Sequence, residues 1–236
     1  MLSVVVKAGL RTLTLDAPAG GGFVVTETPD GDVYERPVVN IEGQKVALGP
    51  NRRDLVPLYH RWENDYSTRR TDDPSEARPV TEDEAFNQYD EWVKSGTERT
   101  IQFTIYEVGS WRPIGVTILR DLDWHSRNAV FGIMIGVGDC RGKGYGTEAT
   151  RLTLDQAFTV MGLHTVLLDA LAFNPAGLRA YQKAGFREIG RWREAALMNG
   201  RRWDVVFMDC LASEFKSPVL ANVYVPDTAA GAMPEG

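Results

Sequence analysis

The chain has 236 residues, of which 43% are hydrophobic and 25% are charged. This balance excludes wholesale disorder and is typical of a globular protein with a full core. The net charge of −6 disfavours sequence-independent binding of nucleic acids, which requires a basic surface. Cys140 and Cys210 stand in no CxxC spacing, so we expect no disulfide framework and a reducing compartment.

Neither a membrane segment nor a secretory signal is visible in the sequence. No apolar run approaches the ~20 residues that span a bilayer, and no basic stretch followed by an apolar core opens the chain. We therefore expect a cytoplasmic protein with no membrane partner.

Residues 1–43 are predicted to form a β-rich extension, with a partly ordered leader as the alternative. Turn residues at 20–22 and 29–32 separate its short strand-like runs. These runs are Val4–Val6, Leu13–Leu15, Phe23–Val25 and Val33–Tyr34.

The next section alternates helices and strands. Apolar residues at helical spacing predict a helix over 51–66, with Pro57 in a first turn or at a break, and the polar stretch 67–80 predicts a loop. Thr81 and Glu84 have the capping-box spacing at the start of a second helix. Strands are expected at about 100–107, 113–121 and 128–136.

A strand–loop–helix section follows, and then the chain closes with strands. A helix should begin after Gly146, and a strand is expected over 164–171. Asn174-Pro175 opens another helix to about Ala184, where Gly185 is a fitting stop. Strands over 186–195 and 203–211 precede a loose tail from Ser217. The fold class predicted from this order is mixed α/β (α+β), with helices on both faces of one central sheet.

A glycine loop, Arg141-Gly-Lys-Gly-Tyr-Gly146, lies between a predicted strand and a predicted helix. Glycines at alternate positions allow a tight turn that exposes successive N–H groups, and the helix end adds further donors and a positive dipole. This combination suits a pyrophosphate. The spacing matches neither a Walker loop nor the GxGxxG dinucleotide fingerprint.

Two motifs resemble the GNAT superfamily of acyl-CoA-dependent N-acyltransferases. The segment 141–149 resembles the family's Arg/Gln-x-x-Gly-x-Gly/Ala loop, and 174–186 resembles its Asn…Tyr…Gly-Phe segment. Residues 200–211 resemble the final hairpin of the ribosomal-protein N-terminal, polyamine and antibiotic acetyltransferase branch. The resemblance implies a GNAT-like mixed sheet over residues 44–214, with the extension 1–43 before it and a flexible tail, 215–236, after it.

The resemblance also implies an acetyl-CoA site. The strand around Ile133–Ile135 would splay from the strand at 164–171 to admit the acyl-pantetheine arm, and a backbone N–H near Ile135 would polarise the thioester carbonyl. The cofactor-binding residues implied in this way are Ile133, Arg141, Gly142, Lys143, Gly144, Tyr145, Gly146, Thr147 and Asn174.

Two of the implied roles have structural alternatives. Asn174 would reach the pantetheine arm, but it equally fits a helix N-cap. Tyr181 would protonate the departing thiolate, because a phenol pKa of ~10 lies just above that of a thiol at ~8.5. The alternative for Tyr181 is packing of a helix residue against the sheet.

The general base is not identified by the sequence. The family often carries an acidic residue on the strand before the loop, but Val130 stands there. Five other acids lie in regions that would wall an acceptor site, although each fits a solvated surface charge as well. They are Glu63, Asp65, Glu84, Asp121 and Asp123. Cys140 is expected to end a strand rather than to carry an acyl group, and the histidines show no metal-ligand spacing, so no metal is expected.

The leading interpretation is an N-acetyltransferase that moves an acetyl group from acetyl-CoA to a primary amine of an antibiotic or polyamine by direct attack in a ternary complex. One alternative acceptor is a protein N-terminus, and a different class is a non-catalytic acyl-CoA-binding module. Because an exposed sheet edge invites pairing, residues 1–43 are expected to support a homodimer.

Overall fold

The computed structural model describes residues 4–8, 11–15, 34–71, 78–96 and 99–225. Strands β1 (Val4–Ala8) and β2 (Arg11–Leu15) form an antiparallel two-stranded sheet of their own. They match the first two strand-like runs predicted for the extension. The run Phe23–Val25 lies outside the described residues, and Tyr34 is not in a strand.

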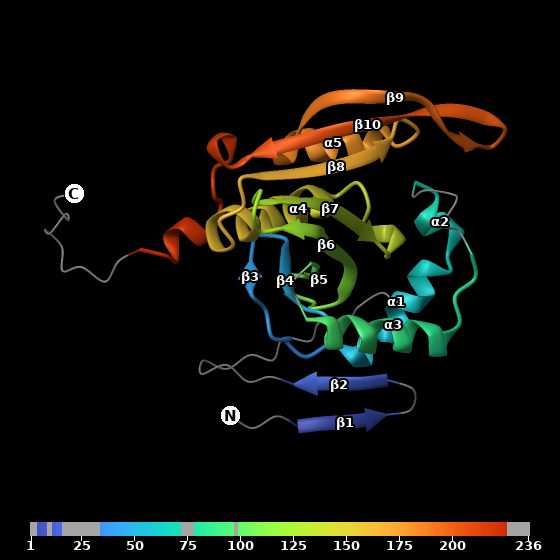
Figure 1. Ribbon diagram of the computed structural model, residues 1–236. Helices are drawn as coiled ribbons and strands as arrows, with labels where there is room; N and C mark the ends of the chain where they lie inside the picture. Colours follow the sequence, from blue (N-terminus) through green and yellow to red (C-terminus); the bar gives the residue numbers. More distant parts are fainter. Residues whose placement is uncertain (1–3, 9–10, 16–33, 72–77, 97–98, 226–236) are drawn as a thin grey trace, which may run out of the picture.

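The main body is built on one eight-stranded sheet, which is mixed as predicted (Figure 1). The strand order is β3-β4-β5-β6-β7-β8-β10-β9, and every neighbouring pair is antiparallel except β7 and β8. The strands are β3 (Ile41–Glu42), β4 (Val46–Pro50), β5 (Ile101–Glu107), β6 (Pro113–Asp123), β7 (Asn128–Ile135), β8 (Thr165–Leu171), β9 (Arg187–Met198) and β10 (Arg201–Leu211).

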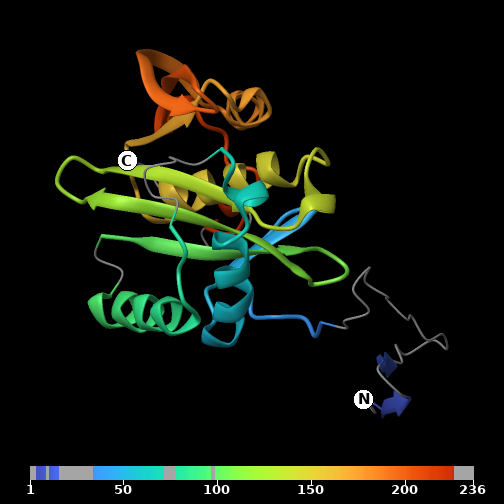
Figure 2. The same cartoon turned by 90° about the vertical axis from the view of Figure 1, so that its right-hand side faces the viewer.

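Helices cover both faces of this sheet (Figures 1 and 2). On one face, Leu152 of α4 (Tyr145–Asp155) shares a buried cluster with Phe103 and Ile105 of β5. On the other face, the Tyr59 hydroxyl of α1 (Val56–Glu63) lies 2.6 Å from Oγ1 of Thr104, which points opposite to its two neighbours. The remaining helices are α2 (Tyr66–Arg69), α3 (Glu82–Ser95) and α5 (Pro175–Ala184).

Capping residues explain where two of the predicted helices begin. The Thr81 hydroxyl accepts a hydrogen bond from the Glu84 N–H at 3.2 Å at the start of α3. The Asn174 side chain does the same for the Gly177 N–H at 2.9 Å, with Pro175 in the first turn of α5. Each cap pairs a helix N–H group that has no partner inside its helix.

The helix predicted over 51–66 is broken in the structure. A short 3₁₀ turn, Arg53–Leu55, precedes α1, and Asp65 then opens the separate helix α2. The Asn64 amide donates to the carbonyl of His60 and to that of Val80, both at 3.0 Å. The side chain of Asn64 therefore ties the chain at the break to a segment 16 residues away, which periodicity alone does not reveal.

The C-terminal part also differs from expectation. The final hairpin is longer than predicted, because Asn199 and Gly200, with φ of 49° and 71°, form a tight two-residue turn between β9 and β10. The expectation of a loose tail from Ser217 does not hold for residues 217–222. The N–H groups of Val219 and Leu220 donate to the buried carboxylate of Asp155 at 3.0 and 2.9 Å.

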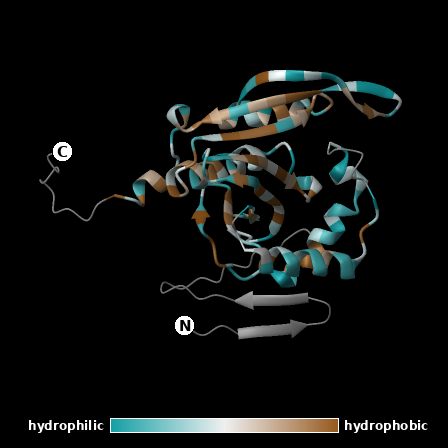
Figure 3. Cartoon of the chain, in the orientation of Figure 1, coloured by the Kyte–Doolittle hydropathy of each residue, from teal (hydrophilic) through white to brown (hydrophobic). Residues whose placement is uncertain are grey.

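The core lies between the sheet and helices α4 and α5. It consists of two clusters of buried residues, one centred on β6, β7, β8 and β10 and the other on β4 and β5. Figure 3 shows apolar residues along the central strands and hydrophilic residues over α1, α2 and α3. No helix among the described residues is long and apolar enough to span a membrane.

Candidate active site

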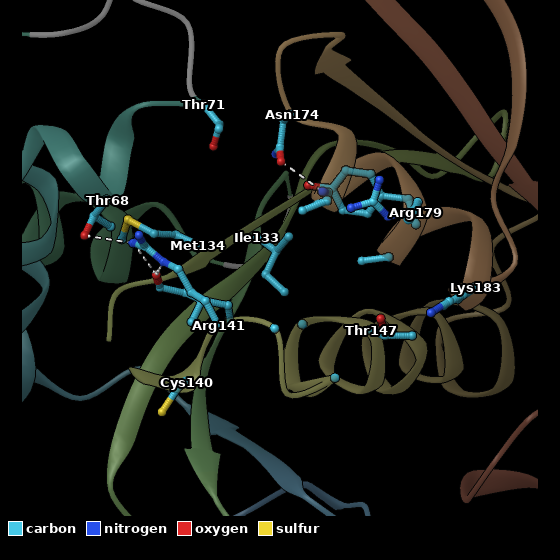
Figure 4. Close-up of a pocket in the computed structure, with 18 of the residues that line it drawn as sticks. Thr68, Thr71, Ile133, Met134, Cys140, Arg141, Thr147, Asn174, Arg179 and Lys183 are labelled. Carbon is cyan, nitrogen blue, oxygen red and sulfur yellow. Dashed lines mark hydrogen bonds between the residues drawn. The ribbon is translucent and has the colours of Figure 1, made fainter. Parts of the chain in front are cut away.

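A cavity of about 400 Å³ opens where β7, the glycine loop and α5 meet (Figure 4). The cavity is lined by α2 (the α2 wall), by the end of β7, by the glycine loop with the start of α4 (the loop wall), and by α5 (the α5 wall). The lining residues are Thr68, Arg70, Thr71, Ile133, Met134, Ile135, Cys140, Arg141, Gly142, Gly144, Gly146, Thr147, Asn174, Ala176, Gly177, Arg179, Ala180, Tyr181 and Lys183. All the predicted site residues are among them except Lys143 and Tyr145.

The sheet is split beside this cavity, as the sequence predicts. Registered pairs between β7 and β8 end at Val130 and Leu167, although β7 continues to Ile135. The Gly136 N–H donates to the Ile114 carbonyl of the β6 side at 2.9 Å. Because successive backbone groups alternate in direction, the N–H and carbonyl of Ile135 face the open, β8 side.

The glycine loop adopts a backbone conformation that requires glycine. Gly142 and Gly144 have φ of 74° and 88°, and Gly144 is the N-cap of α4. The first N–H groups of α4 have no partners within the helix and lie at the cavity with the positive end of the helix dipole. The loop and helix end together can hold an anionic group by backbone donors.

Arg141 fastens the loop to α2 and to β7. Its guanidinium donates to the Ile135 carbonyl through Nε at 3.3 Å and through Nη2 at 3.0 Å. It also donates to Oγ1 of Thr68 at 3.1 Å and to the carbonyl of Ser67 at 3.3 Å. Arg141 thus lines the cavity, but its guanidinium makes its hydrogen bonds to groups of the protein itself.

Tyr145 and Lys143 do not line the cavity. The Tyr145 hydroxyl donates to Oε1 of Glu107 at 2.6 Å, and this bond, followed by burial, raises the pKa of Tyr145 to about 12. The Lys143 carbonyl accepts a hydrogen bond from Nζ of Lys45 at 3.0 Å. The side chain of Tyr145 is thus engaged by Glu107, which leaves its backbone for the predicted contact with the cofactor, whereas at Lys143 it is the backbone carbonyl that is engaged.

The turn between β3 and β4 is hydrogen-bonded to the first turn of α4, directly after the glycine loop. The two carboxylate oxygens of Glu148, in the first turn of α4, accept the N–H groups of Gln44 at 2.5 Å and Lys45 at 3.0 Å. A Cβ at Gly43 would lie 2.5 Å from Oε1 of Glu148, so a larger residue at this position would displace the carboxylate.

The α5 wall presents side chains of a different kind. Tyr181 packs edge-on against Phe131 and Phe186, with ring centroids 6.3 and 6.2 Å away. Arg179 and Lys183, one turn apart, extend from the exposed side of α5 towards the cavity (Figure 4). Among the described residues, neither of these two cations makes a hydrogen bond or ion pair.

Comparison with known proteins identifies the family of this chain. Residues 47–187 match the family model described as an acetyltransferase (GNAT) domain. The chain belongs to the GNAT acetyltransferase family. The GNAT fold and an acyl-CoA-dependent N-acetyltransferase activity, both expected from the sequence, are confirmed.

Three findings identify relatives within the GNAT family. The spermidine N(1)-acetyltransferase of Vibrio cholerae is 30% identical over 133 residues, which are 56% of this chain and 75% of the relative. A crystal structure of the Vibrio cholerae spermidine N-acetyltransferase in complex with CoA and spermine superposes with a TM-score of 0.64 at 25% identity. It covers 72% of this chain and 97% of that chain. A dodecameric structure of the same enzyme has a TM-score of 0.60 at 25% identity, with coverage of 72% and 95%.

None of the five acids considered for the base lines the cavity. Asp65 caps α2, and hydrogen bonds from Thr68 and Ser67 lower its pKa. Asp123 accepts two N–H groups of its own turn, whereas Glu84 and Asp121 pair with arginines. Glu63 differs, because burial raises its pKa.

Cys140 and the histidines show no catalytic arrangement. Cys140 is 3% exposed, and burial, followed by the charge of Asp139, raises the pKa of its thiol to about 12. The thiol therefore stays protonated and is a poor nucleophile. In the part of the chain that is described, no three metal-ligating side chains are grouped.

Several residues of this GNAT site were missed by the sequence reasoning. Arg179 and Lys183 could have been found, because both stand within the Asn…Tyr motif at an i, i+4 spacing that places them on one helix face. The α2 residues and the Lys45 contact carry no such signal, since they come from segments about 70 and 100 residues away.

Proposed function

We propose that this chain transfers the acetyl group of acetyl-CoA to a primary amine of a polyamine by direct attack in a ternary complex. The observation that carries the proposal is that the open end of the β7–β8 pair, the glycine loop and Tyr181 meet in one cavity. The spermidine acetyltransferase relatives and the net charge of −6, which suits a cationic acceptor, support the choice of amine.

Backbone groups would bind and polarise the donor. The N–H groups from Arg141 to Gly146 and the first turn of α4, with Thr147, would hold the pyrophosphate. The acyl-pantetheine arm would pass between Ile133 and Asn174 into the split. There the Ile135 N–H would donate to the thioester oxygen as negative charge develops on it.

Tyr181 would complete the transfer. The amine nitrogen attacks the thioester carbon, the C–S bond breaks, and the Tyr181 hydroxyl gives its proton to the departing thiolate; the proton that the nitrogen loses as the amide forms returns to the phenolate. An alkylammonium with a pKa near 10.4 costs about 4–5 kcal/mol to deprotonate at pH 7, so the amine must also lose a proton before attack.

A panel of amines tests this proposal. The purified chain is given acetyl-CoA with spermidine, spermine, an aminoglycoside or a peptide with an unblocked N-terminus, and thiol release and product mass are measured. We expect spermidine or spermine to give a kcat/KM at least about tenfold above the others. Preference for the peptide would favour a protein acceptor, and binding of acetyl-CoA without turnover of any amine would favour the non-catalytic module.

We further propose that the chain works as a homo-oligomer in the cytoplasm. Support comes from the dodecameric relative, while the contribution of residues 1–43 to a dimer stays a prediction. Light scattering on the full chain and on a variant lacking residues 1–33 measures the mass of the oligomer with and without this segment. An unchanged oligomer mass after truncation would contradict a role of residues 1–33 of the extension in the dimer.

A further inference from the structure

We infer that Arg141 is a positioning residue that joins α2 to the end of β7 and so couples the α2 wall of the cavity to the site of the thioester. The inference rests on the proposed function, since it concerns the residue whose N–H would face the thioester oxygen. It differs from the role in phosphate binding that the charge of Arg141 suggests.

The donors of Arg141 are almost fully used by the protein itself. A guanidinium has five N–H groups in a planar fork. One on Nε and one on Nη2 reach the Ile135 carbonyl, a second on Nη2 reaches Thr68, and one on Nη1 reaches Ser67. A single N–H is left for a ligand, so a role in clamping phosphate would require this network to break.

The network continues into α2 through a buried hydroxyl. Thr68 is 8% exposed, and its Oγ1 accepts from Arg141 while donating to Oδ2 of Asp65 at 2.7 Å. Asp65 in turn caps α2 by accepting the Ser67 N–H at 2.9 Å. The guanidinium is therefore bound to Thr68 (Figure 4), whose position in α2 is in turn fixed by Asp65.

At the other end, Arg141 takes the place of a missing strand partner. The carbonyl of Ile135 faces the side from which β8 has separated, so no neighbouring strand pairs it. A backbone carbonyl left without a strand partner in this partly buried position is stabilised by another donor, and the guanidinium supplies that donor with a positive charge. Since the N–H and carbonyl of Ile135 point to the same side, fixing the carbonyl also fixes the direction of the N–H.

This arrangement makes the α2 wall and the end of β7 interdependent. Thr68, Arg70 and Thr71 line the wall opposite α5. A ligand that moves α2 must move Thr68, and through Arg141 it must move the end of β7. Binding of an acceptor against α2 would thus change the position of the Ile135 N–H.

The test compares Arg141→Gln, Arg141→Lys, Thr68→Val and the double variant Arg141→Gln/Thr68→Val with the wild type. Arg151→Gln is the matched control, because Arg151 is an exposed arginine of α4 outside the cavity. The measurements are the Kd for acetyl-CoA, kcat and KM with spermidine, and amide hydrogen exchange over residues 66–71 with and without acetyl-CoA.

We expect Arg141→Gln to lower kcat about tenfold or more with the Kd for acetyl-CoA changed less than about threefold, because the donor is misplaced but the backbone cradle remains. Arg141→Lys should not rescue kcat, since an ammonium cannot span both partners. The double variant should be no slower than Arg141→Gln alone, because both changes break one network. In the wild type, acetyl-CoA should slow exchange in α2, and Arg141→Gln should abolish this effect.

A tenfold weaker, salt-dependent binding of acetyl-CoA with unchanged kcat would assign Arg141 to the phosphates and overturn the inference. Additive losses in the double variant would also overturn it. If the wild type acetylates no amine, the proposed function fails, but exchange in α2 still decides the coupling because it needs only acetyl-CoA. If Arg141→Gln does not fold, Thr68→Val carries the same comparison.

Discussion

The loop wall and the α5 wall of the cavity are built on different principles. Three residues tie the loop wall to other elements: Arg141 reaches α2 and β7, Tyr145 reaches Glu107 of β5, and Glu148 holds the turn before β4. The α5 wall is held by its own N-cap and by ring packing of Tyr181, and it presents Arg179 and Lys183 without protein partners among the described residues.

The difference indicates a division of labour. Backbone donors recognise an anion only if they are already in place, and the three anchors fix them before the ligand arrives. Charged side chains on an exposed helix face can adjust to a ligand, at a cost in side-chain entropy. Changes to the loop wall should therefore be severe and changes to the exposed cations mild.

The largest effect is expected for Gly144→Glu. A non-glycine residue at φ of 88° costs about 1–2 kcal/mol, its Cβ would lie 3.3 Å from Nζ of Lys45, and its charge would oppose an anion. Calorimetry should show acetyl-CoA binding weakened at least about 100-fold, or by about 2.7 kcal/mol. Gly162→Glu is the control, because Gly162 has a similar φ of 66° and open space around its Cβ. Equal losses in both variants would mean that backbone strain alone is responsible.

Tyr181→Phe should have the next largest effect, and it should lower the rate of acetyl transfer without weakening the binding of acetyl-CoA. The variant keeps the ring that packs on Phe131 and Phe186 and loses the hydroxyl. We expect kcat to fall about 100-fold, with the Kd for acetyl-CoA and the melting temperature unchanged. Steady-state kinetics and calorimetry measure this. A kcat within twofold of the wild type would leave Tyr181 with packing as its role.

A smaller effect is expected when the exposed cations of α5 are neutralised. Arg179→Gln and Lys183→Gln should each weaken acetyl-CoA binding by about two- to fivefold, the size of an exposed charge interaction. The loss should shrink at high salt because exposed charges are screened. A loss as large as that of Gly144→Glu would show that the two walls do not differ as described.

The smallest effect on catalysis is expected for Cys140→Ala. Since burial raises the pKa of the Cys140 thiol to about 12, almost no thiolate forms at pH 8, and iodoacetamide should label it slowly in the folded protein. We expect kcat within about twofold of the wild type and a free energy of unfolding lower by roughly 1 kcal/mol, from lost packing. A covalent acetyl adduct on Cys140, sought by mass spectrometry, would contradict direct attack.

Elements with local signals were predicted well from the sequence. Thr81 and Asn174 marked the starts of α3 and α5, and Gly185 marked the end of α5, because capping depends on residues within a few positions. Pro57 was predicted to lie in a first turn or at a break, and it lies in the first turn of α1. The break before α2 was not predicted, because it depends on the contact of Asn64 with Val80. The turn at Asn199-Gly200 carried a local signal that was overlooked.

The sequence by itself determined the family, the mixed sheet and the glycine loop, since its motifs encode a backbone conformation through Gly142 and Gly144. Only the tertiary structure decided which loop side chains face the cofactor. It turned Arg141 and Tyr145 towards α2 and Glu107, and it brought Thr68 and Lys45 to the loop. The physical reason is that backbone conformation is specified locally, whereas a long polar side chain takes the partner that folding places within reach.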